Sequence, residues 1–201
     1  MAAPGAGATL AQWLAYLGQI HVTAIDLGLA RLRPVAQALA LLPPQAHVVT
    51  VAGTNGKGST TMALACMYEA AGYRVGLYQS PHVYRFNERI RVQGAEADDA
   101  QIIAALAAVE QARQQCGVSL SFFESTTLAA WWVFRAQGCQ VWVLEVGLGG
   151  RLDAVNLIDP DAPDFTPVLQ RIAHKHVSLG IKAQEYTIVS HHLMKAVGAV
   201  L

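Results

Sequence analysis

The residues between 47 and 60 are of the types that bind phosphate groups. Gly53, Gly56 and Gly58 free the backbone to turn its N–H groups inward around an anion, and the helix expected next adds its positive N-terminal end. Lys57 can reach β- and γ-phosphates, and the hydroxyl of Ser59 can ligate Mg²⁺. The segment therefore predicts an ATP-binding loop with a catalytic Lys57. Its binding residues are Thr54, Asn55, Gly56, Lys57, Gly58 and Ser59.

This loop departs from the common phosphate-loop pattern in two places. Val51 stands where that pattern has its first glycine, and Gly58 stands where it has Ser or Thr. The hydroxyl arrives one residue late, at Ser59. Taken alone, the segment also fits a glycine-rich turn between a strand and a helix that happens to contain a lysine.

A second candidate group is Glu145, which closes the apolar run 140–145. Mg²⁺ prefers oxygen ligands and neutralises phosphate charge during phosphoryl transfer. We therefore expect Glu145 to act in catalysis and to share a metal ion with Ser59. A solvated glutamate at the end of a strand is the alternative.

These groups require strands that end together. Apolar, β-branched runs predict buried strands at 48–51, 74–78 and 140–145. Composition and periodicity predict helices at 59–71, 99–115 (capped by Asp98) and 125–137. The alternation is typical of an α/β fold with a mostly parallel sheet and flanking helices. Ser80 follows the second strand, at the edge where ligands of such sheets collect.

The N-terminal region is uncharged up to Asp26, which raises the question of a signal peptide or membrane anchor. The basic start of a signal is missing, and the apolar positions 10, 13, 14 and 17 form the stripe of a helix that packs on a core. A second helix is expected at 30–42, with Asp26 as its N-cap. The alternating residues 84–92 predict an exposed strand.

The composition limits the possible functions. The 201 residues are 53% hydrophobic, enough for one sizeable core, and Lys plus Arg and Asp plus Glu are both 14. A formal charge of zero gives no sign of a nucleic-acid or membrane binder. Three cysteines without metal-type spacing suggest reduced thiols and a cytoplasmic location.

The motifs together resemble one family. The shifted loop Gly53-Thr-Asn-Gly-Lys-Gly-Ser59 resembles the ATP loop of the Mur ligase superfamily, and Glu145-Val-Gly-Leu-Gly-Gly-Arg-Leu-Asp-Ala154 resembles a signature of its folate ligases, dihydrofolate synthase and folylpolyglutamate synthase. The resemblance covers about residues 10–161. It implies a Mur-ligase-like domain, incomplete at its C-terminal end, over residues 1–161.

The resemblance also implies an activity and further site residues. The expected reaction joins L-glutamate to dihydropteroate or to folates through an acyl phosphate, with ATP and Mg²⁺. Ser80 would lie beside the metal with Ser59 and Glu145. By the same resemblance, the substrate-binding residues would be Asp26, Leu27, Gly28, Leu29, Ser121, Phe122, Phe123, Glu124, Leu152, Asp153 and Ala154.

Residues 162–201 break this resemblance. Residues 166–201 resemble instead the proximal segment of a bacterial flavohaemoprotein globin domain, with His176 as haem ligand and Tyr186 as its partner, which implies a short, mainly helical tail. We therefore expect a monomer with an open sheet edge that is inactive as a ligase by itself. The alternatives are a non-catalytic nucleotide- or folate-binding fragment and a haem-binding chimera.

Overall fold

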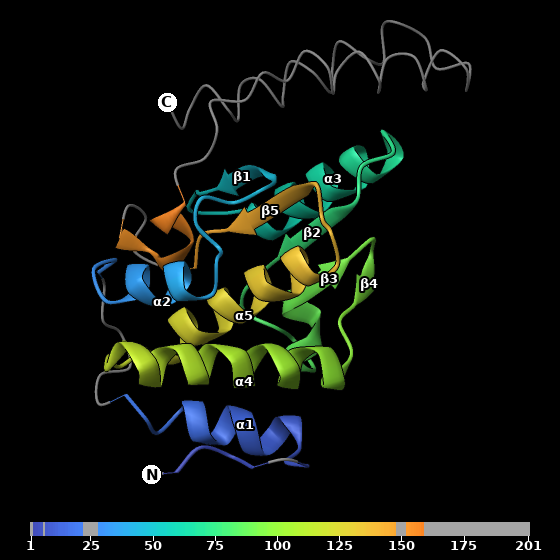
Figure 1. Cartoon of the computed structure of the whole chain (residues 1–201). Helices are drawn as coiled ribbons and strands as arrows, with labels where there is room; N and C mark the ends of the chain where they lie inside the picture. The colour runs from blue at the N-terminus through green and yellow to red at the C-terminus, as the bar shows by residue number, and fades with distance from the viewer. Residues whose placement is uncertain (1, 6, 22–27, 148–151, 159–201) are drawn as a thin grey trace, which may run out of the picture.

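A five-stranded sheet forms the centre of the protein (Figure 1). The computed structural model describes residues 2–5, 7–21, 28–147 and 152–158. In spatial order the strands are β1 (His47–Val51), β5 (Val141–Glu145), β2 (Val75–Tyr78), β3 (Ile90–Val92) and β4 (Ala95–Glu96). β5 pairs in parallel with β1 and β2, whereas β3 pairs antiparallel with β2 and β4. The predicted α/β fold with a mostly parallel sheet is confirmed.

The three parallel strands end side by side. Val51 lies opposite Glu145, and Tyr78 lies opposite Leu144. β5 is therefore inserted between two strands that follow each other in the sequence. As a result, the segments after β1, β2 and β5 emerge at one edge, where open α/β sheets bind ligands.

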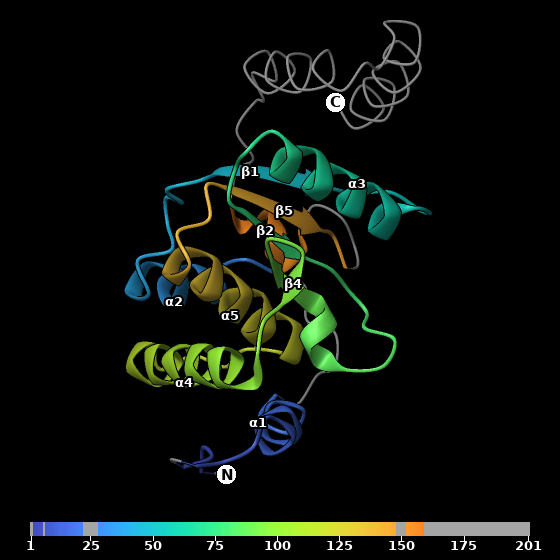
Figure 2. The ribbon, with the colours of Figure 1, turned by 90° about the vertical axis from the view of Figure 1, so that its right-hand side faces the viewer.

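Helices cover the two faces of the sheet to different depths (Figures 1 and 2). α3 (Lys57–Ala70) is the helix that the described part of the chain places on one face, against β2 and β5. α5 (Phe122–Ala136) covers the other face, with α2 (Leu32–Ala38) beside it. α4 (Asp99–Cys116) packs on α5 and α2, and α1 (Leu10–Leu17) packs on α4. The larger hydrophobic core lies on the α5 face and the smaller one lies under α3.

Side-chain caps determine where three helices begin. Thr9, Asp98 and Ser121 each accept a hydrogen bond from the third backbone N–H of the helix, and the third side chain bonds back to the cap. The prediction that Asp98 caps a long helix is confirmed, as is the helix on positions 10–17.

Three predicted boundaries are wrong. The helix predicted at 125–137 begins earlier, at Phe122, because Ser121 is its N-cap. Residues 121–124 are therefore the cap and the first turn of α5. The helix expected at 30–42 is shortened to Leu32–Ala38, since the chain leaves the helical conformation at Ala40, where φ is +53°. Of residues 84–92, only Ile90–Val92 form a strand.

The segment before β3 coils around a single carboxylate. Glu88 accepts hydrogen bonds from the backbone N–H groups of Val83, Tyr84 and Arg85 at 2.8, 2.8 and 2.7 Å. These bonds precede a short 3-10 helix, η1 (Phe86–Arg89), in place of an extended strand. They also lower the pKa of Glu88 to about 2. The side chain of Tyr84 is left 92% exposed.

Within the ranges described, no helix is long and apolar enough to cross a bilayer. β1 is an outer strand of the described sheet.

Candidate active site

The six predicted loop residues lie at the junction between β1 and α3: Thr54, Asn55 and Gly56 precede the helix, and Lys57, Gly58 and Ser59 form the start of its first turn. Gly56 adopts φ +74°, a left-handed conformation that favours glycine, and α3 starts at the next residue. Residues 53–56 and Ser59 are exposed. Nζ of Lys57 donates to the carbonyl of Gly53 at 2.9 Å, so the lysine lies across its own loop. The arrangement presents an exposed helix N-terminus and a cation at the carboxyl edge of the sheet, which suits a phosphate chain.

Glu145 lies beside the start of α3. It is 5% exposed, and its Oε2 accepts a hydrogen bond from the backbone N–H of Ser80 at 3.3 Å. Burial raises the pKa of this carboxyl group, although the Ser80 N–H and the charge of Lys57 oppose the shift. A Cβ on Gly58 would lie 3.8 and 4.0 Å from the two carboxylate oxygens. The glycine at this position therefore leaves open the space beside the carboxylate.

The structure thus brings together the three predicted metal ligands Ser59, Ser80 and Glu145 at one edge. Among the residues described, no cluster of three His, Cys, Asp or Glu side chains could hold a metal ion. The donors available here are hydroxyls and one carboxylate. Mg²⁺ is commonly bound by one or two carboxylates, substrate phosphates and water, so this donor set fits it.

Gln79 and Thr61 join this site, and the sequence reasoning missed both. Nε2 of Gln79 donates to the carbonyl of Gly58 at 2.8 Å and to Oγ1 of Thr61 at 2.9 Å. Thr61 is fully buried in α3. The only signal in the sequence was the position of Gln79, at the end of a predicted strand and directly before Ser80.

On the α5 face, Asp153 fastens the segment after β5. Its two carboxylate oxygens accept hydrogen bonds from the N–H groups of Gly147 and Val155, both at 3.0 Å. A Cβ on Gly147 would lie 2.7 Å from the ring of Phe123, so this glycine allows the close approach. Of the predicted substrate residues here, Asp153 and Ala154 are buried and Leu152 is exposed.

The first turn of α5 contains the predicted residues Ser121, Phe122, Phe123 and Glu124. Ser121 and Glu124 are buried and bond to each other as a capping box, and Glu124 forms an ion pair with Arg31 at 2.8 Å. Phe122 and Phe123 are half-buried, and their ring centres lie 6.2 Å from that of Phe86 and 6.0 Å from that of Tyr78, respectively. Gly28 and Leu29 are half-buried, whereas Asp26 and Leu27 lie outside the described residues.

Arg89 adds a half-buried cation between the two groups of predicted residues. Its guanidinium lies 5.6 Å from the ring centre of Phe86 and 5.9 Å from that of Phe122, and its Nε donates to Nδ1 of His82 at 2.8 Å. The sequence predicted an exposed strand over residues 84–92, which contains Arg85, Arg89 and Arg91. Arg85 is exposed, but Arg89 and Arg91 are half-buried.

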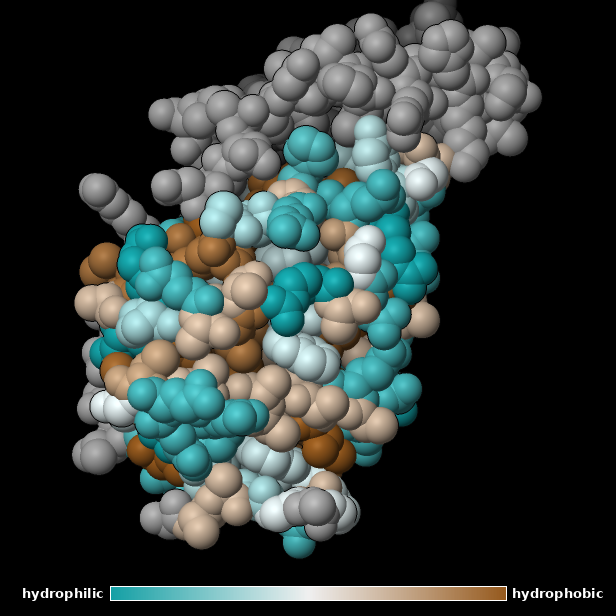
Figure 3. Space-filling model, viewed as in Figure 1, coloured by the Kyte–Doolittle hydropathy of each residue, from teal (hydrophilic) through white to brown (hydrophobic). Residues whose placement is uncertain are grey.

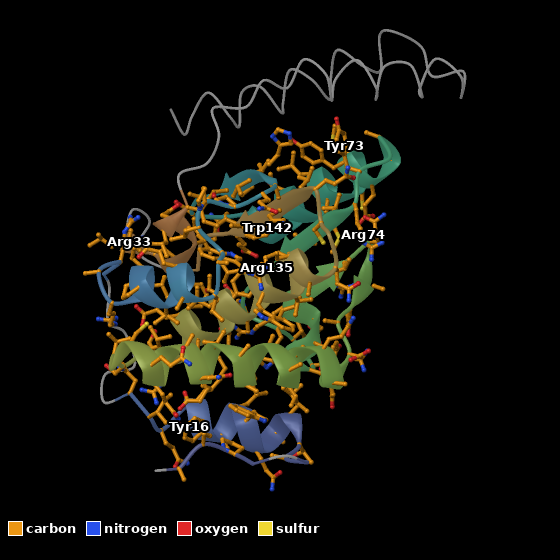
Figure 4. The ribbon with its side chains drawn as sticks, viewed as in Figure 1. Tyr16, Arg33, Tyr73, Arg74, Arg135 and Trp142 are labelled. Carbon is orange, nitrogen blue, oxygen red and sulfur yellow. The ribbon has the colours of Figure 1, made fainter. Side chains whose placement is uncertain are left out.

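A cavity of about 520 Å³ lies at the opposite end of the strands, lined by residues that include Tyr73, Arg135 and Trp142 (Figure 4). Arg135 is held there by the carbonyls of Leu39 and Ala40. The cavity is remote from the phosphate loop and contributes no acidic side chain. On the face in Figure 3, hydrophilic and hydrophobic residues are interspersed over the helices and strands. We therefore place the candidate active site at the carboxyl edge, where the reactive groups converge.

Comparison with known proteins identifies similar chains, although no protein-family model matches. The chain is 48% identical over 165 residues to the dihydrofolate synthase/folylpolyglutamate synthase of Escherichia coli, which covers 82% of this chain and 39% of that relative. The chain therefore spans about two-fifths of the length of this relative.

Solved structures give the same result. An Escherichia coli structure in complex with DHPP and ADP matches with a TM-score of 0.75 and 46% identity, over 86% of this chain and 44% of that one. A Yersinia pestis bifunctional folylpolyglutamate synthase/dihydrofolate synthase complexed with AMPPNP and Mn ion matches with a TM-score of 0.75 and 47% identity, over 80% and 38%. The resemblance to a globin segment finds no support in these matches, and residues 159–201 lie outside those described.

Proposed function

Because this chain is homologous to part of the bacterial dihydrofolate synthase/folylpolyglutamate synthases, we propose that it supplies the ATP- and metal-binding part of such a ligase. The reaction would join L-glutamate to dihydropteroate or to folates. The observation that carries the proposal is the meeting of the phosphate loop, Ser80 and the buried Glu145 at one edge of the sheet.

The proposed chemistry begins with phosphoryl transfer. A substrate carboxylate would attack the γ-phosphate of ATP, releasing ADP and forming an acyl phosphate. The amine of L-glutamate would then attack the acyl carbon, forming the amide and releasing phosphate. Such a transfer depends on positioning and on stabilising charge. Lys57 and the N-terminus of α3 would hold the phosphates. Ser59, Ser80 and Glu145 would hold Mg²⁺, which neutralises phosphate charge when bound.

The flat end of the substrate would lie on the α5 face. Phe122 and Phe123 offer half-buried aromatic rings, and Leu152 offers an exposed apolar side chain. In support, DHPP is bound together with ADP in the similar Escherichia coli structure. Asp153, Ser121 and Glu124 would act on this substrate indirectly, by fixing the backbone around it.

The test is nucleotide binding to wild type and to Lys57→Ala. A lost charge-assisted contact is worth roughly 1.5–3 kcal/mol, so the variant should bind Mg·ATP about tenfold more weakly or worse. Calorimetry measures both affinities, and thermal unfolding checks that the variant is folded. Equal affinities would rule out the assignment of Lys57.

A non-catalytic role of this chain alone is the second candidate. The chain spans 39% of the length of the Escherichia coli relative. Incubation with ATP, Mg²⁺, dihydropteroate and L-glutamate, followed by mass spectrometry, separates the two: dihydrofolate above a Lys57→Ala control means a working ligase, and binding without product means a fragment.

The proposal extends to location and assembly. We propose a cytoplasmic, monomeric chain whose partners are small molecules. Cys66, Cys116 and Cys139 are free thiols, and burial raises the pKa of Cys139 to about 11, which keeps it protonated. Two domains, 1–161 and 162–201, remain part of the proposal, whereas a haem site at His176 has no observation in its favour.

A further inference from the structure

Gln79 stands at the junction of the proposed metal ligands. It follows β2 directly, so its side chain is set by the sheet, while the next residue, Ser80, uses its backbone N–H to hold Glu145. Its own N–H donates to the carbonyl of Arg89 at 3.0 Å, which continues the pairing between β2 and the chain before β3. The backbone of this residue is therefore fixed independently of any ligand.

The side chain of Gln79 reaches from the sheet to the first turn of α3. Its Nε2 donates both to the Gly58 carbonyl and to Oγ1 of Thr61. Thr61 in turn donates to the carbonyls of Lys57 and Gly58 at 3.1 and 2.9 Å. The amide thus joins the end of β2 to the N-terminal part of α3.

Gly58 brings this amide and the carboxylate to the same place. A Cβ on Gly58 would lie 3.6 Å from Nε2 of Gln79 and 3.8 Å from Oε2 of Glu145. The turn that carries Ser59 is therefore pressed against both side chains. No other side-chain hydrogen bond in the described part of the chain links the end of β2 to α3.

From this geometry we infer that Gln79 is a positioning residue for the metal site. It holds the Ser59 end of α3 at a fixed place relative to Ser80 and Glu145, so that the three ligands are already arranged when Mg·ATP arrives. This inference rests on the proposed nucleotide site. Residues that orient metal ligands without touching the metal typically change metal affinity about 10–100-fold.

The inference predicts a selective loss. Gln79→Leu keeps the size of the side chain and removes its donor, so ATP affinity in Mg²⁺ should fall about tenfold. ATP affinity in the presence of a chelator should not change, because Lys57 and the loop backbone are intact. Calorimetric titration of the full chain with ATP, with Mg²⁺ and with EDTA, measures the two affinities.

Two further variants make the comparison decisive. Thr61→Val removes the other half of the contact at constant shape and should show the same selective loss, which also tests the inference if Gln79→Leu does not fold. Gln140→Leu is the matched control: this glutamine precedes β5 at the end remote from Glu145, and its side-chain oxygen accepts a hydrogen bond from the N–H of Arg74, far from the metal ligands, so both affinities should stay at wild-type values.

The possible results separate the two proposals. If wild type shows no Mg²⁺-dependent ATP binding, the proposed function itself is wrong. If wild type binds and both Gln79→Leu and Thr61→Val keep the same Mg²⁺ dependence, only the role of Gln79 is wrong. An equal loss with and without Mg²⁺ would also overturn the inference, because it would mean a general loosening of α3.

Discussion

Two buried glutamates of this protein are held in opposite ways. Glu110 on α4 accepts hydrogen bonds from Arg113, Tyr16 and Gln114, at 2.7 to 2.8 Å. These partners lower the pKa of Glu110 in spite of its burial. Glu145 accepts one bond, from the Ser80 N–H, and burial raises its pKa.

The difference separates a structural carboxylate from one kept for a ligand. The partners of Glu110 come from α1 and α4, so the charge fastens one helix layer to the next. Glu145 has no ion-pair partner within the described residues. The positive charge of Lys57 acts on it from a distance, while the ammonium group of Lys57 donates a hydrogen bond to the carbonyl of Gly53. A buried carboxylate with so little compensation is costly, which suggests that its partner arrives from outside.

The largest effect that sharpens this comparison is expected from Glu110→Gln. The change leaves the Arg113 guanidinium, which is mostly buried, without its carboxylate, at a cost of about 3 kcal/mol in the free energy of unfolding. Urea unfolding measures it. Mg·ATP affinity should not change, because α4 does not touch the loop; a stability within error of wild type would mean that Glu110 is not structural.

A medium effect is expected from a pair of glycine substitutions. Gly147→Ala forces a Cβ to within 2.7 Å of Phe123, and such overpacking costs about 1–3 kcal/mol. Gly58→Ala meets its neighbours only at ordinary contact distance, 3.6 Å and beyond, so stability should hold while Mg·ATP binding weakens. Thermal unfolding and calorimetry of both variants test this contrast. Equal loss of stability in the two would contradict it.

The smallest change in the free energy of unfolding, and the only stabilising one, is expected from Glu145→Gln. Removing a poorly compensated charge should raise the stability of the ligand-free chain at neutral pH by about 0.5–1 kcal/mol, while Mg²⁺-dependent ATP binding is lost. Urea unfolding without nucleotide and calorimetry with Mg·ATP give the two quantities. A destabilised variant would show that Glu145 is structural like Glu110.

The pH dependence of stability gives the same contrast. A raised folded pKa means that the contribution of Glu145 is most favourable below its ordinary value of 4.5 and is lost as pH rises through the raised value. Glu110 has a lowered pKa, so its contribution is present above 4.5 and is lost as pH falls through the lowered value. Both variants should therefore approach wild-type stability at low pH, where the two carboxyl groups are protonated, and deviate from it with opposite signs above 4.5: Glu110→Gln becomes less stable than wild type and Glu145→Gln more stable.

The sequence predicted the nucleotide side of the site better than the rest. Residues 53–59 are contiguous, and glycine, lysine and hydroxyl in that spacing indicate phosphate binding wherever the loop lies. Gln79 was missed because its hydrogen-bond partners are 18 and 21 residues away in the sequence. Arg89 was missed because its contact with Phe122 depends on how η1 folds. The start of α5 at Phe122 was missed although the sequence contains its local signal. Ser121 and Glu124 form a capping box for the backbone N–H groups of the first turn, but these residues were interpreted as substrate contacts.

The hydrogen bonds from residues 83–85 to Glu88 have a consequence for hydrogen exchange of the backbone amides in this segment. Tyr84 is the most exposed large hydrophobic side chain described, yet its N–H and those of its two neighbours donate to one carboxylate. An exposed side chain therefore belongs here to a residue whose backbone N–H is hydrogen-bonded. These three amides should exchange their hydrogens slowly, like those of a helix, and should stay protected in acid until the pH nears the pKa of Glu88, about 2.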